Sequence, residues 1–287
     1  MSDLSTAEQS LRDGDPAAAL RLLQEQVKAR PADARLRVFL FQLLAVLGQW
    51  ERALNQLNVA ATLDPGALAM AQMYREAIRC EVLRARVFAG KTAPMVFGQP
   101  EQWLALLVEA LLQEGRGNFT EGAALRARAL EEAPASPGRL DQQPFQWIAD
   151  ADPRLGPVIE GVINGRYYWI PFDCLACLHI EKPADLRDTV WMPAHFTFAN
   201  GGESVGLIPT RYPGSETSGD GLVLLARRTE WSEPRPGLYH GLGQRLLTTD
   251  CGEGPIMDIR EVLLNRAAAE ETVASSEHAT QVSELGA

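Results

Sequence analysis

Polar and apolar residues are distributed differently in the two halves of the chain. Up to about residue 138, Ala and Leu are interspersed with Arg, Gln and Glu, and Pro stands where a helix would begin or end. After the Pro-rich segment 133–138, short apolar or aromatic runs are separated by Gly, Pro, Asp and Asn. Such runs are typical of strands in a mixed, mainly antiparallel sheet. The pattern predicts an α + β protein of two domains: helical repeats over 1–138 and an α+β domain over 139–266.

Individual elements follow from the same pattern. Segment 67–89 predicts one long helix without a matching partner. Four runs predict strands: 167–170, 196–198, 206–208 and 222–226. Segment 258–264 predicts a terminal amphipathic helix that Asp258 caps.

The helical half contains a repeat with a period of 34 residues. Segment 14–20, GDPAAAL, is matched by segment 48–54, GQWERAL, and the same offset pairs Leu23 with Leu57 and Pro31 with Pro65. Gly at the turn, small residues early in the second helix and Pro after it form the tetratricopeptide pattern. A weaker third copy begins at Gly117, 69 residues after the second. We therefore expect two good repeats followed by degenerate helix pairs.

Stacked helical hairpins bind peptides or helices on a concave face lined by the first helix of each pair. The repeat register predicts a mixed apolar and charged surface, suited to an amphipathic ligand. The residues that it places there are Leu4, Glu8, Leu11, Arg35, Val38, Gln42, Gln72, Met73, Glu76 and Arg79. The apolar members could equally be core between hairpins.

Composition narrows the function further. The 287 residues carry a net charge of −10 and no basic stripe, which disfavours nucleic acid as a partner. The most apolar stretch, 38–47, is about half of the roughly twenty residues that a membrane-spanning helix needs, so no membrane insertion is expected. The N-terminus is polar, and we expect a cytoplasmic protein. Segment 267–287 has four Glu and no Lys or Arg and is predicted to be a disordered acidic tail.

Three constellations could carry chemistry. Segment 202–206, GESVG, matches the G-x-S-x-G motif around Ser204, with His240 and Asp250 downstream, but a nucleophile elbow needs a strand before the Ser and a helix after it. Asn200 and the glycines before the motif predict a hairpin turn instead. The pattern around Ser204 therefore disfavours a hydrolase.

Cys174 and Cys177 form a C-x-x-C pair, yet a zinc site normally needs four ligands, and buried thiols are the simpler interpretation. Acidic residues near the end, Asp250, Glu253, Asp258 and Glu261, are more typical of a solvated turn and a helix start than of a magnesium site. The sequence predicts no catalytic, cofactor-binding or metal-ligating residue and thus a protein that is not an enzyme.

Four ordered motifs in the second half resemble a known family. They are NGRYYWIPF (164–172), LRDTVWMPA (186–194), PTRYPGSE (209–216) and LGQRLLTTD (242–250), the last followed by DIR (258–260). They are similar to the ImpE/SciE-type (TagJ) family, which also has tetratricopeptide-like helices in front. The resemblance therefore covers residues 1 to about 266.

The resemblance implies a non-enzymatic, cytoplasmic accessory protein of a bacterial type VI secretion system. Such proteins are thought to bind the N-terminal helix of the small contractile-sheath subunit, TssB (VipA), and are linked, directly or indirectly, with the sheath-recycling AAA+ ATPase ClpV. A generic tetratricopeptide cochaperone with another client and a Ser204 hydrolase remain as alternatives. The family motifs are expected to be structural, with Arg166, Arg187 and Arg211 forming ion pairs with Asp188, Glu216 or Asp258. Which domain holds the ligand, and whether the protein dimerises, stay open.

Overall fold

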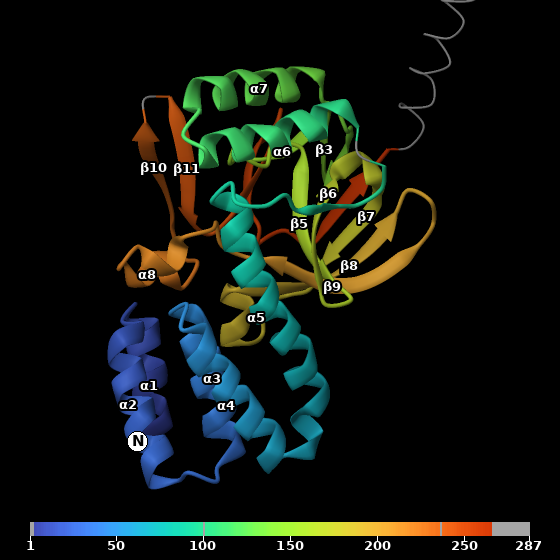
Figure 1. The fold of residues 1–287 in the computed structure, drawn as a ribbon. Helices are drawn as coiled ribbons and strands as arrows, with labels where there is room; N and C mark the ends of the chain where they lie inside the picture. The colour runs from blue at the N-terminus through green and yellow to red at the C-terminus, as the bar shows by residue number, and fades with distance from the viewer. Residues whose placement is uncertain (1–2, 100, 236, 266–287) are drawn as a thin grey trace, which may run out of the picture.

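The computed structural model describes residues 3–99, 101–235 and 237–265 (Figure 1). The predicted acidic tail, 267–287, lies outside the described residues. Within the described ranges, helical repeats are followed by a sheet-rich part, which confirms the predicted fold class.

The first five helices form the repeat region, at the bottom of Figure 1. They are α1 (Asp3–Arg12), α2 (Pro16–Ala29), α3 (Ala34–Val46), α4 (Trp50–Leu63) and α5 (Leu68–Phe88), with a short 3-10 helix, η1 (Pro65–Ala67), before α5. Asp15 caps α2 by accepting a hydrogen bond from the amide of Ala18 at 2.7 Å. The turns between paired helices use Gly14 (φ +82°) and Gly48 (φ +65°), which confirms the reason for glycine there. The single long helix predicted over 67–89 is confirmed as α5.

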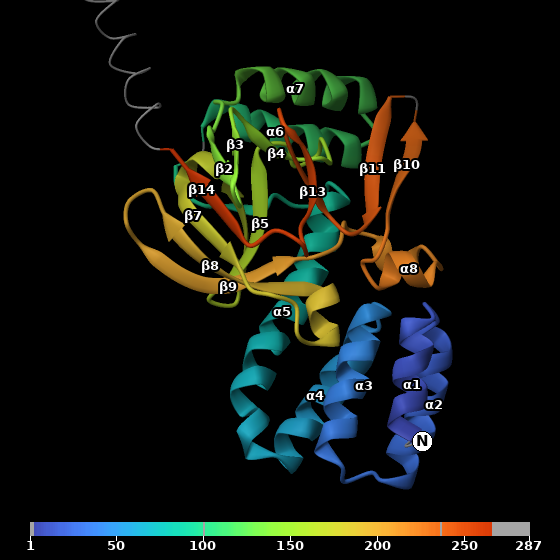
Figure 2. The ribbon, with the colours of Figure 1, turned by 180° about the vertical axis from the view of Figure 1, so that it is seen from behind.

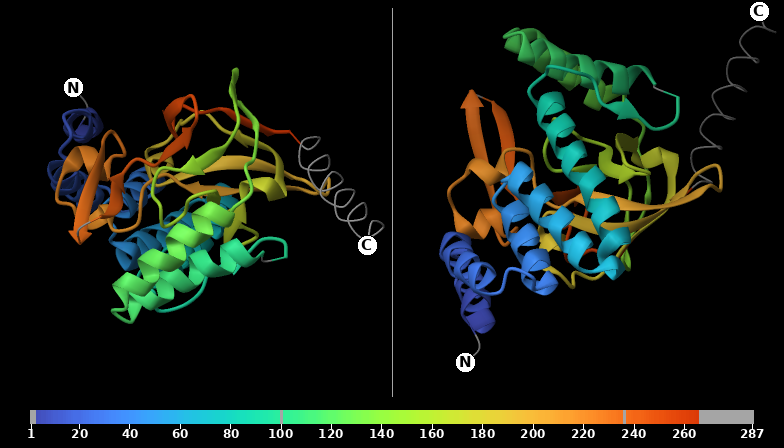
Figure 3. Two further views of the ribbon diagram at one scale, coloured as in Figure 1. Left: turned by 90° about the horizontal axis from the view of Figure 1, so that it is seen from above. Right: turned by 60° about the horizontal axis from the view of Figure 1, so that its bottom comes forward.

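A third hairpin, α6 (Gln102–Gly115) and α7 (Phe119–Glu132), corresponds to the weak third copy. Gly117 at its turn has φ +88°. This hairpin lies at the far end of the sheet-rich part from α1–α4 rather than stacked on them, as Figure 1 and the right-hand view of Figure 3 show.

Nine strands form the main sheet in the order β1-β6-β5-β9-β8-β7-β14-β2-β3. Every neighbouring pair is antiparallel except β1 with β6. In this order their bounds are Met95–Val96, Arg166–Pro171, Val158–Ile163, Glu203–Pro209, Trp191–Phe198, Leu175–Ile180, Glu261–Leu264, Gly138–Leu140 and Gln143–Phe145. The back view in Figure 2 shows β14 beside β7.

Smaller sheets complete the second half. β10 (Thr229–Arg235) and β11 (Leu238–Gly243) form a hairpin, and β4 (Ile148–Asp150), β12 (Leu246–Thr249) and β13 (Gly252–Pro255) form a three-stranded sheet. Short 3-10 helices η2 (Phe172–Cys174) and η3 (Leu186–Thr189) connect strands, and a further one, η4 (Ser215–Thr217), follows β9.

Two element predictions were wrong. Segment 222–226 is not a strand, because residues 222–224 belong to helix α8 (Gly221–Leu224) and residues 225–226 form the turn after it. Asp220 caps the start of α8 by accepting from the amides of Leu222 and Val223. Segment 258–264 is not a helix, because residues 261–264 form β14, which pairs with β7 on one side and β2 on the other. The hydrophobic period of this short apolar run does not distinguish a helix from a strand. Pairing with the two neighbouring strands decided its conformation.

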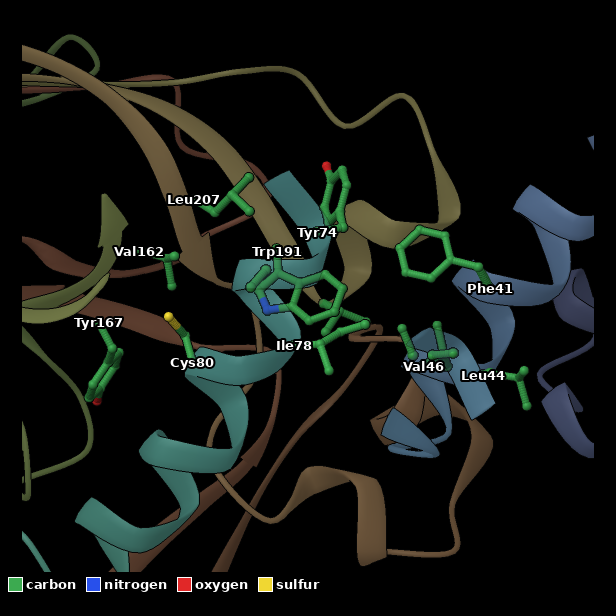
Figure 4. Close-up of a cluster of buried hydrophobic side chains, with 14 of the residues drawn as sticks. Phe41, Leu44, Val46, Tyr74, Ile78, Cys80, Val162, Tyr167, Trp191 and Leu207 are labelled. Carbon is green, nitrogen blue, oxygen red and sulfur yellow. The ribbon is translucent and has the colours of Figure 1, made fainter. Parts of the chain in front are cut away.

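One buried cluster joins the repeats to the main sheet around Trp191, which is fully buried (Figure 4). Its ring lies 5.9 Å from Trp50 and 5.7 Å from Tyr74 between centroids, and its indole Nε1 donates to Glu81 Oε1 at 3.0 Å. Helix α3 contributes Phe41, 5.7 Å from Tyr74. The cluster contains residues from both sides of residue 138. The division of the chain into two domains at that residue therefore remains a prediction.

Candidate peptide-binding grooves

The ten predicted surface residues do not form one surface. Five of them line a groove of about 730 Å³ between α1 and α3, which we call the repeat groove. Its lining is Glu8, Leu11, Arg12, Ala34, Arg35, Val38, Phe39, Gln42, Asp64, Ala184, Asp185, Leu186 and Arg227. The predicted members are Glu8, Leu11, Arg35, Val38 and Gln42.

The repeat groove has an apolar floor and a charged rim. Val38, Phe39 and Leu186 are half-buried, and Leu11 is buried. The rim carries three acidic and three basic side chains, namely Glu8, Asp64, Asp185, Arg12, Arg35 and Arg227. From Ala34 to Gln42 the α3 wall is about 12 Å long at 1.5 Å per residue. These features suit a short amphipathic helix with charges of both signs.

Three other predicted residues, Gln72, Met73 and Glu76, line a second groove of about 800 Å³, which we call the sheet groove. Its remaining lining is Ala69, Val162, Asn164, Gly165, Arg166, Pro193, Ala194, His195, Val205, Gly206 and Leu207. Arg79 is exposed and forms an ion pair with Glu76 at 2.6 Å. Leu4 lies in the first turn of α1.

Helix η3 separates the two grooves. Its Leu186 packs against the central buried cluster, and the Arg187 guanidinium lies 4.9 Å from the centre of the Tyr74 ring on α5. Asp188 holds the turn by accepting from the amides of Ala184 and Asp185. The protein's own chain therefore fills the middle of the concave face and leaves room for a ligand on either side of it.

The ion pairs expected for the family motifs were assigned to the wrong partners. Arg187 pairs with Asp185 rather than Asp188. Arg211 is buried and donates to two carbonyl oxygens, of Val46 at 2.8 Å and of Leu224 at 2.5 Å. For Arg166, no ion pair is found among the residues that the structure describes. Arg211 thus links the end of α3 to α8 and is structural, as expected, but through backbone oxygens.

Sequence reasoning missed a buried ionic network that fixes α5 to the sheet. Arg84 of α5 makes two bonds to Glu160 of β5, from Nε to Oε1 at 2.6 Å and from Nη2 to Oε2 at 2.8 Å. Arg245 reaches the same carboxylate at 3.1 Å and bonds Asp150 at 2.6 Å. The sequence did contain a signal for this network, namely Arg84 on a long helix and Arg245 in a family motif. The sequence does not show which carboxylates these residues pair with, because the partners are brought together only by the fold.

The carboxylates of this network respond differently to burial. Burial alone would raise the pKa of Glu160, but Arg84 and Arg245 outweigh it and lower the pKa. For Asp150, burial outweighs the attraction of Arg245 and raises the pKa to about 6. The network fixes α5 to β5, and an earlier part of α5 forms one wall of the sheet groove.

The candidate chemical sites lack the arrangement that their reactions need. Ser204 lies inside β9, which continues to Pro209, so no strand–turn–helix elbow presents its hydroxyl. The predicted hairpin turn is present, with Gly201 at φ +85°. Burial raises the pKa of the Cys174 thiol to about 12, which disfavours the thiolate that redox or metal chemistry requires. Among the described residues, no group of three or more His, Cys, Asp and Glu side chains could hold a metal.

Comparisons with known proteins agree with these features. Residues 142–263 match the ImpE protein family, and residues 10–76 match the tetratricopeptide repeat. The chain is 51% identical over 256 residues to the type VI secretion system accessory component TagJ of Pseudomonas aeruginosa, covering 89% of this chain and 90% of that protein.

A crystal structure of a Vibrio parahaemolyticus protein has a similar fold. Its TM-score is 0.84 at 28% identity, and the match covers 92% of this chain and 99% of that one.

Among the described residues, the helices are all too short or too polar to span a bilayer.

Proposed function

This chain belongs to the TagJ (ImpE) family of type VI secretion accessory components, and from that premise we propose that it is an adaptor for the contractile sheath. Its ligand is the N-terminal helix of the small sheath subunit, of the TssB (VipA) type. The helix lies in the repeat groove, which five of the ten predicted ligand-facing residues line together. That convergence is the observation that carries the proposal.

The shape and chemistry of the repeat groove support a helical guest. Its walls are α1 and α3, and a helix laid between them would present an apolar residue every three or four positions to Val38, Phe39 and Leu186. The rim charges would pair with side chains on the flanks of the guest. A short helix of this kind typically binds with a Kd in the micromolar range, or about −8 kcal/mol. Such modest affinity suits an accessory factor that leaves the sheath after acting.

The link to the AAA+ ATPase ClpV is indirect in this proposal, through the shared sheath subunit. The adaptor is cytoplasmic, acts without catalysis and needs no cofactor. Its function is to hold one helix of a repeating sheath subunit. If a pull-down of purified ClpV by this protein requires the sheath subunit, the indirect link is supported, and capture of ClpV alone would contradict it.

The test is calorimetric titration of the full chain with a synthetic peptide matching the sheath subunit's N-terminal helix. Val38→Asp should raise the Kd by about tenfold or more, because the carboxylate would lose water on the apolar floor. Val82→Asp is the matched control, since Val82 is an exposed residue in the middle of α5 and lines neither groove. Circular dichroism and the unfolding midpoint check that both variants are folded.

Two results would contradict the assignment. Unchanged affinity in a folded Val38→Asp variant would remove the repeat groove as the site. Loss of binding in Met73→Asp, with Val38→Asp unaffected, would move the helix to the sheet groove. Binding of unrelated amphipathic helices with equal affinity would favour a general cochaperone over a sheath adaptor.

A further inference from the structure

Strand β9 has one edge that is only partly paired. Along β8 it pairs over its whole length, from Trp191 opposite Pro209 to Thr197 opposite Glu203. Along β5 it pairs only through Val162 opposite Leu207 and Ile163 opposite Gly206. Beyond Ile163 the chain turns into β6 through Asn164 and Gly165, both at positive φ. Figure 1 shows the β8–β9 hairpin extending past that turn.

The free edge presents backbone donors and acceptors in a defined direction. The amide of Phe198 bonds the carbonyl of Gly202 at 2.8 Å and closes the β8–β9 hairpin. Hydrogen-bonded pairs alternate along an antiparallel ladder, so Ser204 and Gly206 bond to β8. The N–H and C=O groups of Glu203 and the N–H group of Val205 therefore point away from β8, toward the side where β5 has already ended.

The sheet groove lies beside this edge and has exposed apolar side chains. Val205 is 65% exposed and Met73, across the groove on α5, is 46% exposed. Between them, Val162 and Leu207 are buried and form the floor. Large apolar side chains exposed around one concavity are typical of an interaction site. An open strand edge in the same place favours an extended guest over a helical one.

Charge defines the guest further. Glu203 lies on the free edge and favours a basic residue directly opposite it. Arg166 lies at the other end of the groove, exposed and with no ion pair to any described residue, and favours an acidic one. An antiparallel guest would run from the Arg166 end toward Glu203. Its residue opposite Val205 would point into the groove, on the same face as Val205 itself.

We infer that the sheet groove binds an extended segment of a partner protein, which adds as an antiparallel strand to the free edge of β9. The segment carries an acidic residue, then an apolar residue opposite Val205, and a basic residue two positions later, opposite Glu203. This site is separate from the repeat groove across η3 and does not depend on the helix proposed there. The protein thus has one groove suited to a helix and one suited to a strand.

The experiment uses the full chain, labelled with ¹⁵N, and the peptide Ac-Ser-Glu-Val-Thr-Lys-Ser-NH2. Titration should shift the amide resonances of Glu203 and Val205 and slow their hydrogen exchange, because both N–H groups acquire acceptors. The charge-reversed peptide Ac-Ser-Lys-Val-Thr-Glu-Ser-NH2 should bind about three to ten times more weakly.

Two substitutions at one position isolate the backbone contribution. Val205→Pro removes the outward N–H without touching a bond to β8, and should raise the Kd for the peptide by about tenfold. Val205→Thr keeps that N–H and a β-branched side chain, and should stay within about threefold. If Val205→Pro does not fold, Met73→Asp tests the apolar wall by the same titration, with Val82→Asp as its control, and should also raise the Kd by about tenfold.

Each other outcome would overturn the inference. The absence of shifts at Glu203 and Val205 at millimolar peptide would show that the edge does not bind strands. Shifts that depend on protein concentration without peptide would assign the edge to a second copy. Protection of these amides in the free full chain, lost in a variant ending at Asn265, would assign it to the chain's own last residues. Failure of the Val38 titration would leave this result unaffected.

Discussion

Replacing Arg84 by Met tests whether the buried ionic network holds the repeats against the sheet. The guanidinium is almost completely buried and serves four acceptors: both oxygens of Glu160, the carbonyl of Arg211 at 2.8 Å, and Glu81 Oε2 at 3.4 Å. Met keeps most of the side-chain length and the helix propensity of α5. The substitution therefore removes charge and hydrogen bonds with little change in helix formation.

The size of the stability loss in Arg84→Met follows from the buried groups that the substitution leaves without a partner. Breaking a buried ion pair by removing one partner costs about 3–5 kcal/mol, because the other charge stays buried. Glu160 would keep Arg245, at 3.1 Å, and the Tyr167 hydroxyl, which places the loss at the lower part of that range. The carbonyl of Arg211 would lose a donor, at about 1 kcal/mol or more. We expect the free energy of unfolding to fall by about 4 kcal/mol.

The assay is urea unfolding followed by tryptophan fluorescence and circular dichroism. Arg86→Met is the matched control, because Arg86 is exposed on the same helix and should change stability by less than about 0.5 kcal/mol. The double variant with Glu160→Gln should show a coupling energy of about 2 kcal/mol or more between Arg84 and Glu160. Equal, small losses for Arg84→Met and Arg86→Met would refute the role given to the network.

Three further predictions rest on single groups. Trp191→Ala should lower the free energy of unfolding by about 4 kcal/mol or more in urea titration, since it empties the centre of the cluster between α3, α5 and the sheet and removes the donor to half-buried Glu81; a loss below about 2 kcal/mol would contradict that central position. Burial raises the pKa of Asp150 to about 6 from 3.8, so the folded chain holds a proton that the unfolded chain releases between these values. The stability of the unaltered chain relative to Asp150→Asn should therefore fall by about 2 kcal/mol as the pH rises from about 4 to about 6, and a rise would show a lowered pKa instead. Cys174, whose pKa burial raises to about 12, should react with iodoacetamide at pH 8 far more slowly than exposed Cys251, as mass spectrometry of the labelled peptides can measure; equal rates would show that Cys174 is open to solvent.

The repeats were predictable because their determinants are local. Glycines at 34-residue spacing supply the positive φ that each turn needs, and Asp15 and Pro16 begin α2 wherever the helix packs. Strands with flanking turns, such as β6 and the β8–β9 hairpin, were predictable for the same reason. Residues 222–226 and 258–264 were not, because short apolar runs carry no decisive period. A capping Asp220 in one case and two neighbouring strands in the other chose the conformation.

The ligand-facing surface shows where local reasoning ends. Repeat register placed Val38 and Met73 on the same concave face, and each does line a groove. The register contains no information on η3, more than a hundred residues later in the chain, whose Leu186 and Arg187 divide that face. The Arg84–Glu160 pair spans 76 residues, and the free edge of β9 exists only because β5 ends two residues into their pairing. Helix and turn formation depends on residues a few positions apart, so the sequence determined it. Grooves, buried ion pairs and open edges depend on segments distant along the chain, so only the tertiary structure decided them.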